Sequence, residues 1–168
     1  MKALITLIAV LVVAALAFFL YSSPAAPPEM TEAEVAQHEA EVRGELTGAV
    51  DSYGDALLGG DTEAFMSSYA FDARVYWPGM NFDKAELQAF MEEFFQTVTW
   101  TGYDAELSDL FVHGDAAYAI WEVSETFQAE GQGPQSGISS CFTRFERVDG
   151  VWKVHRDVCG PRDALPEG

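Results

Sequence analysis

Apolar residues recur every three to four positions in the first half of the chain, a pattern that predicts amphipathic helices. The first stripe comprises Val35, Val42, Leu46, Val50, Tyr53 and Leu57. A capping box of Thr31 and Glu34 precedes this stripe, and Gly59-Gly60 ends it. Asp61 caps a short second helix that runs to Ser68.

A third helix is expected after a short strand. The segment 73–79, "ARVYWPG", reads as a strand closed by a Pro-Gly turn. Asp83 and Glu86 then form a second capping box. The apolar stripe of this helix is Leu87, Phe90, Met91, Phe94, Phe95 and Val98, which we expect to pack in the core.

Long strand-like runs replace the helical pattern after Thr99. They cover residues 100–114, 115–128, 137–148 and 151–159, separated by Gly114-Asp115, a glycine-rich segment and Asp149-Gly150. Connections this short predict antiparallel pairing. Helices followed by a strand meander indicate an α+β domain, with a curved antiparallel sheet wrapped on the N-terminal helices.

The start of the chain differs from the rest. Residues 3–20 are apolar apart from Thr6, and Lys2 precedes them. Residues 1–21 are therefore either a cleavable signal peptide or a single membrane anchor, and both place the domain outside the cytoplasmic membrane. We expect a Pro-rich tether at 22–30, a folded domain at 31–160 and a flexible tail at 161–168.

Charge and composition exclude several functions. The net charge is −18, so the chain lacks the basic face that nucleic acid or an anionic membrane surface requires. Contact with a membrane is expected only through the N-terminal helix. The three histidines are far apart in sequence, and the chain has no CxxC, HExxH, GxSxG, Walker or dinucleotide motif. We therefore expect no metal and no cofactor.

The two cysteines, Cys141 and Cys159, flank the turn at Asp149-Gly150 and either form a disulfide or remain free thiols. A two-residue turn alone would put them on opposite faces of the hairpin. A loop of Val148, Asp149 and Gly150 would place them diagonally, too far apart to bond. A loop of residues 149–151, or a compensating bulge, would bring them face to face.

Three segments in this order resemble the nuclear transport factor 2-like superfamily, and more narrowly its SnoaL-like and ketosteroid-isomerase-related branch. They are "YGDALLGGDTEAFMSSYAFDARVYWPG", "GDAAYAIWEVSE" and "FTRFERVDGVWKVHRD". The resemblance covers roughly residues 40–160. It implies a cystatin-like cone, in which a strongly curved sheet and helices enclose an apolar pocket. It does not settle an activity, because this fold carries many functions.

The residues of the steroid isomerases are only partly kept. The resemblance places the oxyanion-binding tyrosine on Tyr53, the general base on Trp77 and the second oxyanion donor on Cys141. Two of the three chemical groups are thus absent. The resemblance therefore implies a small-molecule-binding domain without steroid isomerase chemistry, whose ligand is a small apolar molecule.

The same resemblance implies which strand residues face the pocket. The pocket positions are Tyr118, Ile120, Glu122, Ser139, Cys141, Thr143, Phe145, His155, Asp157 and Cys159, with Trp77 beside them. Trp77, Trp100, Tyr103 and Tyr118 are also candidates for an aromatic cavity. The opposite face would carry Trp121, Trp152, Val154 and Val158, and relatives that dimerise through this face suggest a homodimer.

His155 and Asp157 are two residues apart on one predicted strand and would project to the same side. One hypothesis is a cofactor-free isomerase, dehydratase or hydratase that uses this pair for acid–base catalysis, assisted by Tyr53 or Glu122. The alternative is that the two side chains hydrogen-bond to each other, or pair with Arg144 and Arg156, without a catalytic role. A structural dimerisation module is a third hypothesis.

Overall fold

The computed structural model describes residues 30–162. The first three elements are α2 (Glu32–Gly59), α3 (Thr62–Ser67) and β1 (Tyr69–Trp77). They are followed by β2 (Met80–Asp83), α4 (Lys84–Thr97) and β3 (Val98–His113). The last three are β4 (Ala116–Ala129), β5 (Gln135–Val148) and β6 (Val151–Pro161). This order confirms the predicted α+β class.

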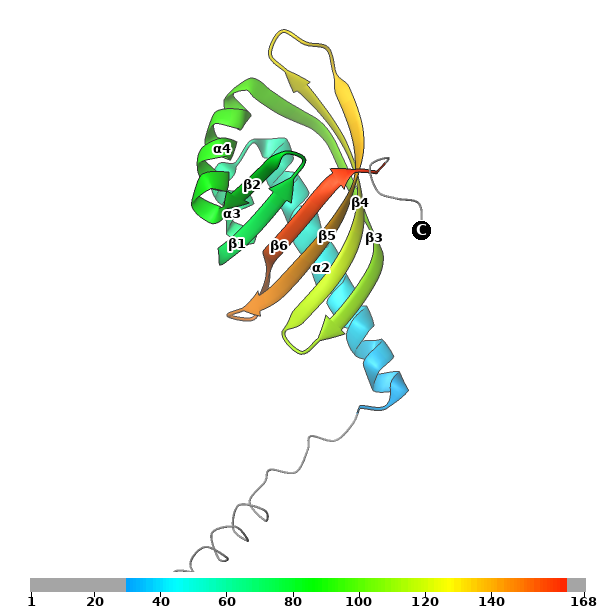
Figure 1. Ribbon diagram of the computed structural model, residues 1–168. Helices are drawn as coiled ribbons and strands as arrows, with labels where there is room; N and C mark the ends of the chain where they lie inside the picture. Colours follow the sequence, from blue (N-terminus) through cyan, green and yellow to red (C-terminus); the bar gives the residue numbers. More distant parts are fainter. Residues whose placement is uncertain (1–29, 163–168) are drawn as a thin grey trace, which may run out of the picture. The chain divides into compact units, whose positions relative to one another are not determined.

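The sheet is strongly curved and not closed, and the helices lie against its concave side (Figure 1). Its strand order is β2-β1-β6-β5-β4-β3. Strands β3 to β6 pair in antiparallel fashion, as their short connections predict. Two features are not predicted from the sequence: β2 forms a hairpin with β1, and β1 lies parallel to β6. No local sequence pattern predicts this parallel pairing, because it joins residues that are far apart in sequence.

Local signals position the helices as predicted. The Asp61 carboxylate accepts a hydrogen bond from the Ala64 amide at the start of α3. Asp83 and Glu86 form a reciprocal capping box at the start of α4. Helix α2 ends at Gly59, and Gly60 has a positive φ of 61°. Glycine therefore ends α2 in the backbone conformation that disfavours other residues.

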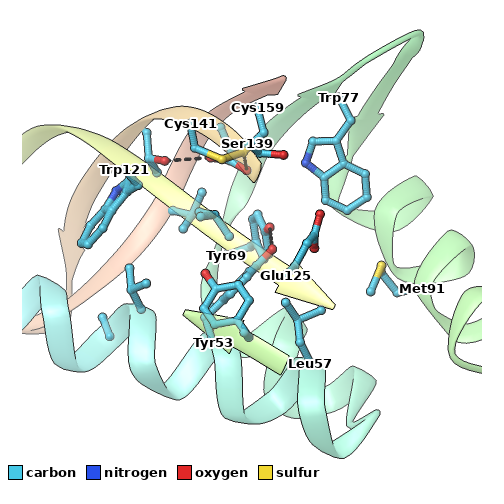
Figure 2. A pocket seen from close by; sticks show the side chains of 18 of the residues that line it. Tyr53, Leu57, Tyr69, Trp77, Met91, Trp121, Glu125, Ser139, Cys141 and Cys159 are labelled. Atoms are coloured by element: carbon cyan, nitrogen blue, oxygen red, sulfur yellow. Dashed lines mark hydrogen bonds between the residues drawn. A yellow bond between two sulfur atoms is a disulfide. The ribbon is translucent and has the colours of Figure 1, made fainter. Parts of the chain in front are cut away.

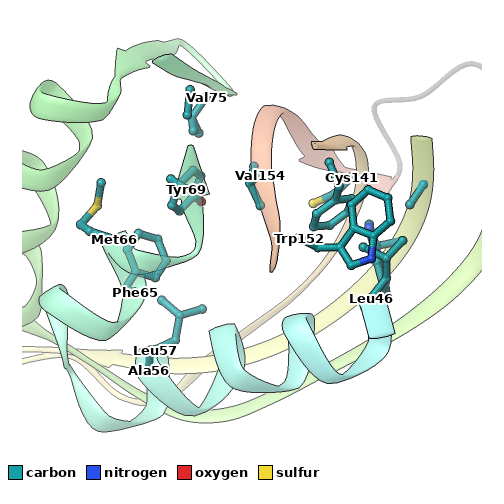
Figure 3. Close-up of a cluster of buried hydrophobic side chains, with 14 of the residues drawn as sticks. Leu46, Ala56, Leu57, Phe65, Met66, Tyr69, Val75, Cys141, Trp152 and Val154 are labelled. Atoms are coloured by element: carbon teal, nitrogen blue, oxygen red, sulfur yellow. The ribbon is translucent and has the colours of Figure 1, made fainter. Parts of the chain in front are cut away.

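The core lies between the helices and the concave sheet face (Figure 3). Phe65 of α3 and Tyr69 of β1 are almost fully buried at one end, and Leu46 of α2 is buried near Trp152 of β6 at the other. The carboxylate of Glu45 accepts hydrogen bonds from the Trp152 indole at 2.7 Å and from Arg147. These contacts join α2 to the β5–β6 hairpin.

The β5–β6 hairpin has the register that allows a disulfide. Asp149 and Gly150 both have positive φ, at 52° and 80°, and form a two-residue turn. A bulge then adds His155 to β6, so that Cys141 stands opposite Cys159. The structure joins these two cysteines by a disulfide. The compensating bulge is thus the alternative that the molecule adopts.

The expectations for residues 1–29 and 163–168 lie outside the described residues. They concern the signal peptide or anchor, most of the Pro-rich tether and most of the tail. Within residues 30–162, no helix is long and apolar enough to cross a membrane.

Candidate ligand pocket

A cavity of about 570 Å³ lies between the helices and the concave face of the sheet. Tyr53 and Leu57 enter it from α2, and the Cys141–Cys159 disulfide lies on the opposite side (Figure 2). Its aromatic lining residues are Tyr53, Tyr69, Trp77, Phe90, Phe94, Trp100, Tyr103, Trp121, Phe127, Phe145 and Trp152. The size and the apolar wall are typical of a small-molecule site.

Asp157 is a buried carboxyl group in the wall of this cavity. Its side chain lies on the inner face of β6, and the residue is only 7% exposed. The Thr143 hydroxyl donates a 2.8 Å hydrogen bond to it, and the Trp77 indole lines the same cavity. Burial raises the pKa of Asp157 from 3.8 to about 6, although the Thr143 hydroxyl and the Trp77 indole act in the opposite direction. This carboxyl therefore titrates close to neutral pH.

Three tyrosines, from α2, β1 and β3, line the same cavity as Asp157. The Tyr69 hydroxyl donates to the Tyr53 hydroxyl at 3.4 Å, and the Tyr53 and Tyr103 rings are 5.9 Å apart. Burial raises the pKa of each tyrosine, and the charge of Asp157 raises it further. All three hydroxyls therefore remain protonated; Tyr69 donates to Tyr53, and the Tyr53 and Tyr103 hydroxyls can donate hydrogen bonds to a ligand.

Glu125 of β4 brings a second carboxyl group to the cavity. Its Cα pairs with that of Tyr103 on β3, and its side chain accepts a 3.0 Å hydrogen bond from the Trp100 indole. The charges of Asp157 and Glu125 both raise the pKa of Tyr103, so its hydroxyl lies within electrostatic reach of both carboxyls.

Several residues that the sequence singles out do line the cavity. They are Tyr53, Trp77, Trp100, Tyr103, Ser139, Cys141, Thr143, Phe145, Asp157 and Cys159. Tyr69 and Glu125 also line the cavity but are not predicted from the sequence, because no motif surrounds them. Alternation along β4 would have identified Glu125 once Trp121 was known to point inward.

The predicted facing of β4 is wrong. Trp121 pairs with Cys141 in register, so both side chains lie on the inner face. Trp121, Val123, Glu125 and Phe127 line the cavity, whereas Tyr118, Ile120 and Glu122 lie on the outer face. Ile120 is 42% exposed, and Glu122 pairs with Arg162 at the surface. When the inward–outward alternation of a strand is shifted by one residue, every side chain is assigned to the opposite face.

The predicted pairing of His155 with Asp157 is also wrong. His155 is the extra residue of the bulge, so its side chain does not share the face of Asp157. Its ring contacts Asp72 at 3.1 Å through Nε2 and Arg144 at 3.0 Å through Nδ1. Trp152 and Val154, which precede the bulge, point inward, contrary to expectation.

The outer face of the sheet carries two rows of cross-strand neighbours. One row is apolar and joins Tyr76, Val158, Phe142 and Ile120. The adjacent row joins Arg74, Arg156, Arg144, Tyr118 and Phe111. Phe142 is 47% exposed and Phe111 62% exposed, so apolar side chains remain uncovered on this face of the chain.

Metal ligation is poorly supported within residues 30–162. One group, Cys141, Asp157 and Cys159, places its donor atoms within 4.8 Å of one another. The two sulfur atoms are joined in the disulfide, so neither is a thiolate that would bind a metal.

Solved structures with the same architecture share little sequence with this chain. A conserved protein from Planctomyces limnophilus is 20% identical, with a TM-score of 0.65, over 74% of this chain and 98% of that one. A ketosteroid isomerase-like protein from Erwinia carotovora atroseptica is 19% identical, with a TM-score of 0.62, over 73% and 96%. A nuclear transport factor 2-like protein with a cystatin-like fold from Novosphingobium aromaticivorans is 19% identical, with a TM-score of 0.61, over 83% and 94%. These likenesses show the fold.

A search of the curated proteins found no match to the sequence. The family model of the SnoaL-like domain matches residues 50–155, which include α3, α4, most of the sheet and the part of α2 that carries Tyr53. Together with the curved sheet and the enclosed cavity, this match shows that the chain belongs to the SnoaL-like domain family.

Proposed function

We propose that this domain binds a small molecule with an apolar body, and that Asp157 contacts a polar group of that molecule. One observation carries the proposal: a mostly apolar cavity of about 570 Å³ has a buried carboxyl group in its wall. The rings supply apolar contact, while the carboxyl and the tyrosine hydroxyls supply orientation. Sites of this composition bind ligands through a few placed polar groups.

Native mass spectrometry of the purified protein tests this proposal. We expect the protein to retain a small molecule, and Val123→Phe to lose it because the larger side chain fills the cavity. Ile120→Phe is the matched control, since Ile120 lies on the same strand but points outward. Retention of the molecule in folded Val123→Phe would contradict the proposal, as would a ligand-free wild type that binds no added compound.

A second candidate function is cofactor-free acid–base catalysis by Asp157. The observation that favours it is the pKa of about 6, which lets this carboxyl exchange a proton near neutral pH. A tyrosine hydroxyl would stabilise the oxygen of an enolised carbonyl. His155 has no part in this reaction, because it contacts Asp72 and Arg144 instead.

Exchange of α-protons detects such chemistry without knowledge of the substrate. We would incubate 2-tetralone with the protein in D₂O and follow loss of the α-proton signal by NMR. Catalysis predicts faster exchange with the wild type than with Asp157→Asn at equal concentration. Equal rates for the two proteins would remove Asp157 as the base for this ketone.

We also propose that the domain is exported, with residues 1–21 as its signal peptide or anchor. The apolar run after Lys2 supports this, and so does the disulfide, because disulfides persist in oxidising compartments. Export to a periplasmic or extracellular position predicts that protease degrades the domain when the outer envelope is opened and the cytoplasmic membrane is intact, and secretion predicts that the domain is recovered from the medium. A protected domain in the cytoplasmic fraction would contradict it.

A homodimer through the outer sheet face is the third part of the proposal. The apolar row of Tyr76, Val158, Phe142 and Ile120 supports it, since exposed apolar patches mark interaction surfaces.

A further inference from the structure

We propose that the ligand of this cavity carries a positively charged amine, which pairs with the carboxyl groups of Asp157 and Glu125. This inference rests on the proposed function, because it names the chemical class of the ligand in the same cavity. Within residues 30–162, no lysine, arginine or histidine forms an ion pair with either carboxyl. A cationic ligand would supply the missing charge.

The surroundings of Asp157 contain hydrogen-bond donors but no cation. The Thr143 hydroxyl on β5 donates a hydrogen bond to it, and the neutral Trp77 indole on β1 lines the same cavity. Tyr53 of α2, Tyr69 of β1 and Tyr103 of β3 lie within electrostatic reach of it, and all three are neutral. A buried carboxylate without a counter-charge is costly, so proteins usually pair such groups. At this position the open side is the cavity.

Glu125 on β4 is a second carboxyl of this cavity that forms no ion pair with a basic residue of the described range 30–162. Its side chain accepts the Trp100 indole N–H, which is also a neutral donor. Glu125 and Asp157 both line the same cavity, together with the Tyr103 ring. An ammonium group bound there would meet two acids and several hydroxyl acceptors.

The basic residues within 30–162 do not neutralise this region. Lys153 lines the cavity, but its ammonium donates a 2.6 Å hydrogen bond to the Ser67 carbonyl. It precedes Asp157 by four residues, about 13 Å along a strand. Arg144 and Arg156 are cross-strand neighbours on the outer face of the sheet, where they contact the His155 ring.

The aromatic wall also favours an organic cation over other charged ligands. A ring face attracts a cation through its quadrupole, and tryptophan does so most strongly. Trp77, Trp100 and Trp121 all line the cavity. An anion in the same cavity would be repelled by the two carboxylates.

Three probes with one carbon skeleton and different charges test the inference. They are 3-phenylpropylamine, 3-phenylpropan-1-ol and 3-phenylpropanoate, titrated into the full-length protein by calorimetry at high salt. High salt suppresses general attraction to the acidic surface. At pH 8 we expect the amine to bind about tenfold or more tightly than the alcohol, which is the magnitude of one charge-assisted hydrogen bond. We expect the carboxylate to bind most weakly.

Proton release provides a second readout of the same contact. Near pH 5.5, binding of the amine should ionise Asp157 and release a proton to the buffer, and binding of the alcohol should not. Asp157→Asn should abolish both the proton release and most of the preference for the amine. Glu122→Gln is the matched control, because it removes one negative charge from the outer face and should leave the preference unchanged.

The outcomes separate this inference from the proposed function. Binding of the alcohol or the carboxylate as tightly as the amine would overturn the cationic ligand while leaving a ligand pocket. An unchanged preference in Asp157→Asn would also overturn it; Glu125→Gln replaces this variant if Asp157→Asn fails to fold. Failure of all three probes to bind would count against both the inference and the proposed function.

Discussion

Thr143 and Asp157 are cross-strand neighbours on β5 and β6, and the Thr143 hydroxyl donates a 2.8 Å hydrogen bond to the buried carboxylate. This register exists only because His155 forms a bulge between the turn and Asp157. The same bulge pairs Cys141 with Cys159 two residues further along the strands. A single extra residue therefore positions the acid, its hydrogen-bond donor and the disulfide.

The pH dependence of stability provides a first prediction about Asp157. Burial raises its pKa to about 6 in the folded protein from the 3.8 of a solvated aspartate, so the folded protein holds this proton more tightly than the unfolded chain. The contribution of Asp157 to the free energy of unfolding should therefore be highest below pH 4 and fall as the pH rises through 6. A difference of about two pKa units corresponds to roughly 3 kcal/mol.

Urea denaturation of wild type and Asp157→Asn between pH 4 and pH 8 measures this effect. The other acids contribute equally to both proteins, so the difference between the two isolates Asp157. We expect Asp157→Asn to become the more stable protein, relative to wild type, as the pH rises. A difference that does not change with pH would show that Asp157 is not buried as described.

The close approach of α2 to β3 provides a second prediction. A Cβ on Gly54 would lie 2.3 Å from Cδ1 of the Tyr103 ring, so Gly54→Ala must displace this ring. We expect a loss of about 1–3 kcal/mol in unfolding free energy, as for overpacked cores, and weaker ligand binding.

Gly48→Ala is the control, because it lies on the same helix with nothing within 4 Å of the added Cβ. It should stabilise the protein by about 0.5–1 kcal/mol, since alanine favours a helix. Thermal denaturation of the two variants tests the expected loss of stability in Gly54→Ala and the expected gain in Gly48→Ala. If Gly54→Ala were as stable as Gly48→Ala, the Tyr103 ring would not pack on Gly54.

The disulfide provides a third prediction. Cys141 and Cys159 are 18 residues apart, and closing a loop of this length stabilises a protein by about 3 kcal/mol. Denaturation with and without a reductant should show a loss of this size. The Cys141→Ala, Cys159→Ala double variant should be insensitive to the reductant, and sensitivity retained in this variant would assign the effect to something else.

The outer face provides a fourth prediction. If the apolar row forms a homodimer, Phe142→Asp should weaken association at least about tenfold, because it puts a charge in the centre of the row. Val148→Asp is the control, since Val148 is also exposed but lies beside the turn. Analytical ultracentrifugation measures both variants. A monomeric wild type at micromolar concentration would contradict the dimer.

Much of the fold follows from local signals in the sequence. The caps at Asp61 and Asp83 begin α3 and α4, and the turn at Asp149-Gly150 makes the last hairpin. These features depend on residues within a few positions of one another, so a single sequence reveals them. The resemblance to the SnoaL-like branch adds the curved sheet and the expectation of a pocket.

The candidate site is predicted less well, because it depends on which face of the sheet each strand residue occupies. The sequence identifies Asp157, Trp77 and Tyr53, but it inverts the facing of β4 and places His155 with Asp157. Alternation along a strand specifies two faces but does not say which one is buried when both carry apolar residues. On β4, Trp121 and Ile120 are equally plausible core residues until the pairing of Trp121 with Cys141 decides between them.

The sequence by itself determines the helices, the turns and the acidity, and the family resemblance places Asp157 on the inner face of the last strand, although it places His155 there as well. These depend on local backbone preferences, on composition and on the family resemblance. Only the tertiary structure decides that β1 lies parallel to β6, that the bulge at His155 separates the histidine from Asp157, and that Glu125 joins the cavity. Those features arise from contacts between distant strands, whose register is set by packing and not by neighbouring residues.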